Sequence, residues 1–125
     1  MKKKNILAVD DMPPMLSMIR FMLRAEYQIF PASSVKDARA LLERTDLQMD
    51  LVLLDLDMPV ASGFELLQEI KSNPDLQHLP VIMLTGNTEQ ESVIRAVQAG
   101  AIGYIVKPFT EENLKQKIRA ALKFK

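Results

Sequence analysis

Short apolar runs alternate with amphipathic segments along the whole sequence, and this alternation restricts the fold more than any other feature. Five of the runs are predicted to be strands: Asn5 to Val9, Tyr27 to Ala32, Asp50 to Leu54, Val81 to Leu84 and Gly103 to Val106. Strands separated by helical segments are typical of strand–helix–strand units around a parallel sheet. The runs Leu51 to Leu54 and Val81 to Leu84 are almost wholly apolar, which predicts burial on both faces. At 125 residues, the chain is expected to form a single α/β domain over residues 1–125.

Signals for the start and end of helices lie between these runs. Three pairs have the spacing of a capping box, which satisfies free N–H groups at a helix start: Ser34 with Asp37, Ser62 with Glu65, and Thr88 with Glu91. Pro13 and Pro14 stand where a first helical turn can lack N–H donors, and Gly100 follows a helical segment ending at Ala99. Thr110 is expected to cap the last helix. These signals predict five helices, one after each strand.

The charge balance limits the partners that the chain can attract. Sixteen Lys and Arg residues balance sixteen Asp and Glu residues, so no long-range attraction to nucleic acid or to an anionic membrane is expected. The sequence has no cysteine, which excludes disulfides and thiolate metal sites. Its apolar stretches fall well short of the roughly 20 residues that a membrane-spanning helix needs. We therefore expect a cytoplasmic protein that neither inserts into a membrane nor binds nucleic acid directly, with its single histidine, His78, in a solvent-facing loop.

Polar residues follow four of the five predicted strands. They are Asp10-Asp11 after the first, Asp55-Leu56-Asp57 after the third, Thr85-Gly86 after the fourth and Lys107-Pro108 after the fifth. Ligands of open parallel sheets bind beyond the carboxyl ends of the strands, so these loops can converge on one site. Taken singly, each residue has an ordinary structural explanation: Asp11 can cap a helix, Thr85 can end a strand, and Lys107 can lie in solvent with its stem on the sheet.

Considered together, the same residues indicate phosphoryl chemistry. Several carboxylates at one edge of a sheet repel each other unless a cation is present, and Mg²⁺ prefers oxygen ligands of this kind. An Asp carboxylate beside such an ion can attack phosphorus and form an aspartyl phosphate. The transferred group carries its charge on three outer oxygens, and a lysine and a hydroxyl such as Lys107 and Thr85 can neutralise two of them.

These residues also carry a resemblance to a known family. The sequence resembles the receiver domain of two-component response regulators from Asn5 to about Leu122, in its stand-alone, chemotaxis-type form. The matching motifs are Asp10-Asp11, Asp55 followed by Met58-Pro59 and Gly63, Thr85-Gly86, and Tyr104-Ile105-Val106-Lys107-Pro108. The resemblance implies a doubly wound, five-stranded parallel sheet with five helices and the flavodoxin-like strand order 2-1-3-4-5.

The resemblance also implies a role for each matching residue. Asp55 would accept a phosphoryl group from the phosphohistidine of a histidine kinase or histidine phosphotransfer protein. Asp11 and Asp55 would bind Mg²⁺, or Mn²⁺ as a substitute, together with the backbone carbonyl of Asp57, while Asp10 would act through a water. Thr85 and Lys107 would contact the phosphoryl oxygens, and the Lys107–Pro108 peptide bond would be cis.

Tyr104 occupies the position of the aromatic switch residue of this family. If Thr85 moves toward the phosphoryl group, the Tyr104 ring can turn inward and change the surface of the fourth helix, fifth strand and fifth helix. The alternative is an ordinary half-buried strand tyrosine.

The first helix carries a candidate partner surface. Its apolar stripe is predicted to be Met12, Met15, Leu16, Ile19 and Leu23. This stripe leaves Met18 and Phe21 at its edge, where they suit kinase docking, which is common on this helix in the family. Peripheral core packing is the alternative for both residues.

The function expected from these features is a phosphorylation-controlled binding module rather than a turnover enzyme. Without an effector domain its output would be a contact with a downstream protein, and it would be a monomer or a phosphorylation-dependent dimer. The alternative is a receiver fragment of a larger DNA-binding regulator or hybrid kinase. An aspartyl-phosphate hydrolase would place its Asp pair after the first strand, and a flavin binder would need a Ser/Thr/Gly-rich loop there instead of Asp10-Asp11-Met12.

Overall fold

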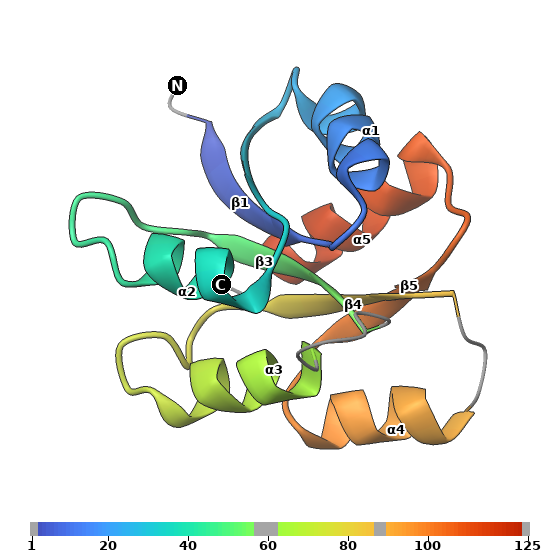
Figure 1. The fold of residues 1–125 in the computed structure, drawn as a ribbon. Helices are drawn as coiled ribbons and strands as arrows, with labels where there is room; N and C mark the ends of the chain where they lie inside the picture. The colour runs from blue at the N-terminus through green and yellow to red at the C-terminus, as the bar shows by residue number, and fades with distance from the viewer. Residues whose placement is uncertain (1–2, 57–62, 87–89, 124–125) are drawn as a thin grey trace.

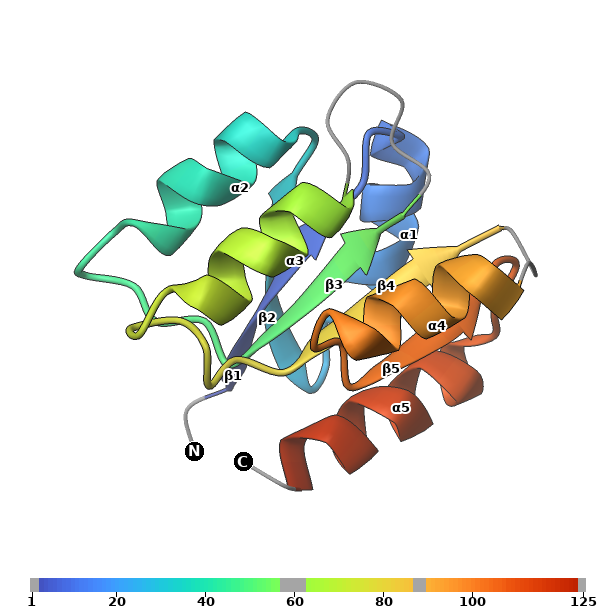
Figure 2. The same ribbon diagram turned by 90° about the horizontal axis from the view of Figure 1, so that it is seen from below.

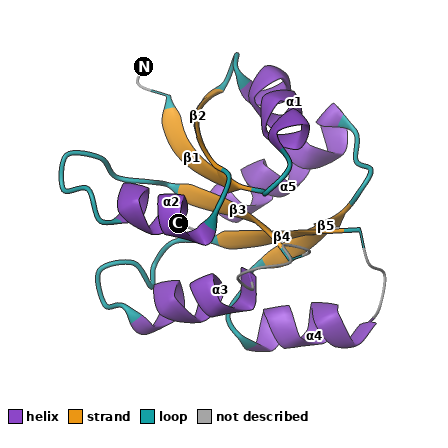
Figure 3. Cartoon of the chain, viewed as in Figure 1, coloured by secondary structure: helices purple, strands orange, loops and turns teal. Residues whose placement is uncertain are grey.

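The five strands of the computed structural model pair in parallel in one sheet, in the order β2-β1-β3-β4-β5. The structure describes residues 3–56, 63–86 and 90–123. The strands are β1 (Lys4–Val9), β2 (Tyr27–Ala32), β3 (Leu51–Asp55), β4 (Val81–Thr85) and β5 (Gly103–Val106). The helices are α1 (Pro13–Leu23), α2 (Val35–Leu42), α3 (Gly63–Ser72), α4 (Gln90–Gln98) and α5 (Glu111–Lys123). Strands and helices alternate along the chain (Figure 3), so the fold prediction is confirmed.

The two faces of the sheet are covered by different helices. Helices α1 and α5 lie on one face and α2, α3 and α4 on the other (Figure 1). The first face is packed by Leu16, Ile19, Leu23, Leu114 and Ile118, and the second by Val35, Ala38, Leu66, Ile70 and Ala96. All residues of β3 and β4 are buried, which confirms the prediction made from their apolar sequences. Because both faces are closed, ligands can reach the sheet only along its edges.

The strand order places a topological switch point between β1 and β3. The chain leaves β1 toward β2 on one side and returns to β3 on the other, so the loops after β1 and β3 diverge there. Figure 2 shows the arrowheads of the strands directed to the same edge. Asp10 and Asp55 stand at this point, at the ends of β1 and β3.

Two strands end later than the sequence predicts. Asp55 belongs to β3 because it pairs with Leu84, and Thr85 belongs to β4 because it pairs with Val106. Asp50 precedes β3, and its carboxylate accepts a hydrogen bond from the Asn5 N–H at 2.8 Å. The sheet ladder therefore holds the backbone of both Asp55 and Thr85.

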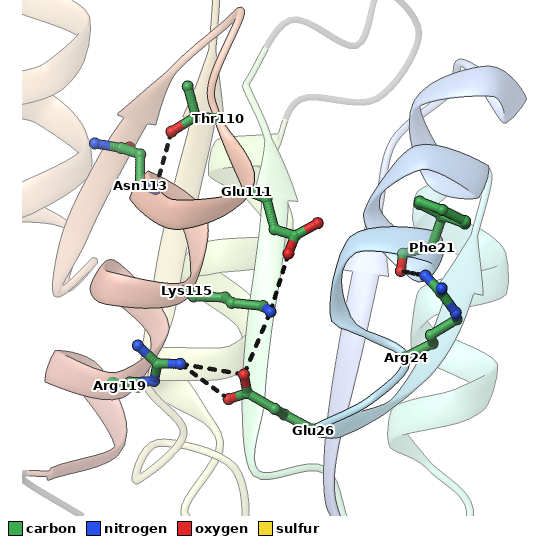
Figure 4. A network of polar contacts seen from close by, with 8 residues as sticks. All are labelled: Phe21, Arg24, Glu26, Thr110, Glu111, Asn113, Lys115 and Arg119. Carbon is green, nitrogen blue, oxygen red and sulfur yellow. Dashed lines mark hydrogen bonds and ion pairs between the residues drawn. The ribbon is translucent and has the colours of Figure 1, made fainter.

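Local hydrogen bonds explain several helix boundaries. The Ser34 hydroxyl accepts from the Asp37 N–H at 3.0 Å. The Thr110 hydroxyl accepts from the Asn113 N–H, also at 3.0 Å (Figure 4). Pro13 and Pro14 occupy the first positions of α1. Gly100, at φ 110°, adopts the left-handed conformation that favours glycine after α4. These predicted signals are confirmed, whereas Ser62, Thr88 and the Glu91 side chain lie outside the described residues.

The prediction that Met12 belongs to the core stripe of α1 is wrong. Its side chain is 57% exposed, while Leu16, Ile19 and Leu23 are buried. Met12 is the N-cap residue, with an extended backbone at φ −103° and ψ 103°, so helical periodicity does not apply to it. Within the described residues, no helix has the length and apolar character needed to cross a membrane.

Candidate functional site

Three carboxylates meet at the switch point of the sheet. Asp10, Asp11 and Asp55 each offer an oxygen, and these oxygens lie within 4.8 Å of one another. Asp10 and Asp55 are buried, and Asp11 is half-buried. Strands β1 and β3 pair in parallel, so the fold imposes this close approach of like charges.

Asp10 is oriented by two hydrogen bonds from different parts of the chain. Its Oδ1 accepts from the backbone N–H of Met12 at 2.9 Å, and its Oδ2 accepts from the Lys107 ammonium at 3.0 Å. The first contact holds the turn into α1, and the second joins β1 to the loop after β5. Asp10 therefore links two loops as well as contributing charge.

Lys107 is the cation of the described site. Its Nζ lies 3.0 Å from Asp10 Oδ2 and 3.1 Å from Asp55 Oδ1, with 17% of its side chain exposed. Burial lowers the pKa of Lys107, but the hydrogen bonds and charges of Asp10 and Asp55 outweigh burial and raise it above the ordinary lysine value. Its backbone N–H donates to the Thr85 carbonyl at 2.8 Å, and the Lys107–Pro108 bond is cis, as expected.

Thr85 is buried at the end of β4, beside the strand that carries Asp55. The register pairs Asp55 with Leu84, so Thr85 lies one residue further toward the carboxyl edge. Tyr104 pairs with Met83, two residues before Thr85, and side chains two apart on a strand share a face. Tyr104 and Thr85 therefore belong to the same face of the sheet, with Thr85 inaccessible and Tyr104 39% exposed.

Gly63, the first residue of α3, has a role at the site that sequence reasoning did not explain. A Cβ at this position would lie 2.5 Å from the backbone oxygen of Asp55, so only glycine allows α3 to start so close to β3. The sequence analysis named Gly63 as a residue of the matching motif but gave no physical reason for a glycine there.

The remaining predicted residues lie away from this cluster or outside the described residues. Asp57, whose carbonyl was a predicted metal ligand, lies outside the described residues. On α1, Met18 is half-buried and Phe21 is 62% exposed, with the Arg24 guanidinium 4.0 Å from the centre of the Phe21 ring. His78 is exposed, as predicted.

The donor set matches a hard divalent cation. Three carboxylates face one ammonium among the described residues of the site, which leaves an excess of negative charge. Oxygen donors alone suit Mg²⁺ or Mn²⁺ better than metals that prefer nitrogen or sulfur. The arrangement can thus hold a cation beside a buried carboxylate, with an ammonium and a hydroxyl on neighbouring strands.

This ordered set of residues on this fold is shared with known proteins. The response regulator receiver domain family matches residues 6–119. The chain belongs to that family. Chemotaxis protein CheY-3 of Vibrio cholerae is 39% identical over 119 residues, which cover 94% of this chain and 90% of that protein.

Two solved structures extend the comparison. Chemotaxis response regulator CheY4 of Vibrio cholerae has a TM-score of 0.89 and 30% identity, covering 97% of this chain and 100% of that chain. The receiver domain of the sensor histidine kinase PA1611 of Pseudomonas aeruginosa has a TM-score of 0.85 and 27% identity, covering 98% of this chain and 99% of that chain. That structure contains a magnesium ion coordinated in its active site cleft. This chain is therefore a receiver domain of two-component signalling with an acidic cluster that could bind a metal ion.

Proposed function

We propose that this receiver domain accepts a phosphoryl group on Asp55 from the phosphohistidine of a histidine kinase or histidine phosphotransfer protein. The observation that carries the proposal is the position of the Asp55 carboxylate, buried at the end of β3 and 3.1 Å from the Lys107 ammonium. It lies in the same cluster as Asp10 and Asp11. Asp10 shares the burial, the cation and the carboxylate neighbours, and Asp55 is chosen over it because Asp55 occupies the phosphoacceptor position that the resemblance to receiver domains implies.

Asp11 and Asp55 are the proposed direct ligands of Mg²⁺, with Mn²⁺ as a substitute and Asp10 acting through a water. The magnesium ion in the receiver domain of PA1611 supports this choice of metal. When bound, the ion neutralises phosphoryl oxygens and reduces repulsion between the carboxylates. The Asp57 carbonyl is proposed as a further ligand.

In the proposed transfer, an oxygen of the Asp55 carboxylate attacks phosphorus. A new O–P bond forms while the P–N bond to the donor imidazole breaks, and the imidazole takes up a proton. Lys107 offsets the charge on one phosphoryl oxygen, and the Thr85 hydroxyl donates to another. Because transfer occurs once on each Asp55, we propose a phosphoryl acceptor rather than a turnover enzyme.

The proposed output is a change in the surface formed by α4, β5 and α5. Thr85 and Tyr104 share a face of the sheet, so a shift of Thr85 toward the phosphoryl group alters the space beside the Tyr104 ring. Exposed apolar residues gather on this surface: Ile94, Val97, Ile102, Tyr104 and Val106. We propose that it contacts the downstream protein, whereas Met18 and Phe21 on α1 contact the phosphodonor.

Intact-protein mass spectrometry tests the phosphoacceptor directly. Incubation with acetyl phosphate and Mg²⁺ is expected to add one phosphoryl group to the wild-type chain and none to Asp55→Asn. The control is Asp75→Asn, which removes an exposed carboxylate in the loop after α3 and should label like wild type. Equal labelling of Asp55→Asn and wild type would show that another residue is the acceptor.

A further inference from the structure

One of the two outer strands of the sheet, β2, borders a basic groove that contains no residue of the phosphoryl site. Strand β2 is the last strand on its side of the sheet. Next to it lies a groove of about 610 Å³ lined by Lys3, by Arg20 of α1, by Arg24 directly after α1, and by residues of β2. No carboxylate is among the described residues that line it, although the chain as a whole has no net charge.

The backbone of β2 presents polar groups to this edge. The Asp10 N–H donates to the Ala32 carbonyl at 3.1 Å, so the main-chain groups of Ala32 face β1. Those groups alternate in direction along a strand, and the N–H and C=O of Tyr27 and Ile29 therefore face away from β1. Pro31 is on the same outward side, where its missing N–H costs no ladder hydrogen bond. Among the described residues, no strand pairs with this side of β2.

The three cations have donor groups available to a ligand. The Lys3 ammonium uses one donor on the Arg24 carbonyl at 2.9 Å, and the Arg24 guanidinium lies over the Phe21 ring and donates to the Phe21 carbonyl (Figure 4). An ammonium has three donors and a guanidinium five, so both keep unused ones. Arg20 forms no hydrogen bond or ion pair with another described residue. Arg20 and Arg24 are four residues apart and so lie on the same side of α1.

We propose that this groove binds an acidic, extended peptide segment of a partner protein, which adds to the sheet as a strand beside β2. The outward N–H and C=O groups of Tyr27 and Ile29 would pair with its backbone, and Lys3, Arg20 and Arg24 would pair with its carboxylates. A strand edge favours an extended ligand over a helix, and a groove lined by cations without carboxylates favours an acidic one. Pro31 limits the pairing to a short segment.

A peptide titration tests the proposal on the full chain. The probe is a blocked hexapeptide of alternating Glu and Thr, and the readout is the shift of backbone amide signals in ¹⁵N-labelled protein. Saturable shifts at Tyr27 and Ile29 are expected, with no binding of the Lys-Thr counterpart. Affinity should fall about tenfold in Arg20→Glu but stay unchanged in Lys36→Glu, a charge reversal on exposed α2. Equal loss in both variants, or no saturable shift at millimolar peptide, would overturn the proposal.

Two further probes separate strand addition from simple charge attraction. A peptide N-methylated at the residues facing β2 keeps its charge but cannot donate to the Ile29 carbonyl, so it should bind about tenfold more weakly. Equal binding of the methylated peptide would exclude strand addition. Shifts at the same amides with oligothymidylate but not with the acidic peptide would assign the groove to nucleic acid instead. None of Asp10, Asp11, Asp55, Thr85 and Lys107 lines the groove, so Asp55→Asn should bind the peptide like wild type.

Discussion

Two sets of ion pairs in this protein hold the same kinds of charge in opposite surroundings. At the end of the sheet, Lys107 contacts Asp10 and Asp55 at 3.0 and 3.1 Å, and both carboxylates are almost fully buried. On the surface, Arg39 meets Glu69 at 2.6 Å, with nearly half of each side chain exposed. The shorter contact is expected to matter less, because water and ions weaken it and already solvate both partners.

The comparison shows why a functional site is a weak point of a stable fold. The buried carboxylates have lost water and face each other, and one ammonium offsets only part of their charge. When Arg39 or Glu69 is removed, the partner that remains is exposed, so no charge is left buried. The protein therefore carries repulsion at the carboxyl ends of its strands that a bound cation would relieve.

Replacing Lys107 should have the largest effect. Lys107→Met leaves Asp10 and Asp55 buried without their cation, so the metal-free free energy of unfolding should fall by about 2–4 kcal/mol. Denaturant unfolding in EDTA measures the loss, and added Mg²⁺ should restore part of it. Lys36→Met on α2 is the control and should change little. If the two variants lose the same stability, the buried pairs contribute no more than a surface charge.

Two glycines test the packing around Asp55. Gly63→Ala forces a Cβ to within 2.5 Å of the Asp55 carbonyl oxygen, and should lower the free energy of unfolding by about 1–3 kcal/mol. Gly103→Ala meets nothing within 4 Å and should be neutral or stabilising by up to about 1 kcal/mol. Chemical denaturation of both variants gives the difference. Similar values would mean that α3 can shift away from Asp55 without cost.

Removing one carboxylate should stabilise the metal-free protein and weaken its binding of Mg²⁺. The described ion pairs link Lys107 to Asp10 and Asp55 but not to Asp11. Asp11→Asn should thus relieve repulsion and raise the metal-free free energy of unfolding by about 0.5–1 kcal/mol. The same change should reduce the rise in thermal midpoint caused by Mg²⁺, since ligand stabilisation follows affinity. A lower metal-free midpoint, or an undiminished response to Mg²⁺, would contradict this account.

The surface pair should show the smallest effect, and one that depends on pH. The hydrogen bond from Arg39 lowers the pKa of Glu69 below its ordinary value of 4.5, although burial acts in the opposite direction. A lowered folded-state pKa adds stability above the unfolded value and loses it as the pH falls through the folded value. The free energy of unfolding of Glu69→Gln should therefore be slightly lower than that of wild type near neutral pH and equal to it in acid. A difference that persists in acid would indicate a packing effect instead.

Sequence reasoning succeeded where local patterns decide the outcome. Alternating apolar and amphipathic segments predicted the strands and helices, and the hydroxyls of Ser34 and Thr110 form the expected caps. It failed at Met12, because the helix begins one residue later and the N-cap residue does not follow helical periodicity. The close approach of Gly63 to the Asp55 backbone was also missed, since Asp55 belongs to a strand and lies eight residues earlier in the chain.

The sequence by itself determined which chemical groups follow the strands: carboxylates after β1 and β3, a hydroxyl at the end of β4 and an ammonium after β5. Only the tertiary structure decided that these groups lie within contact of one another. Asp10 and Lys107 are separated by 97 residues, and their 3.0 Å contact exists because parallel pairing brings the carboxyl ends of all five strands to one edge. The same pairing left β2 at the open side of the sheet, next to three cations whose positions in the sequence suggested no groove.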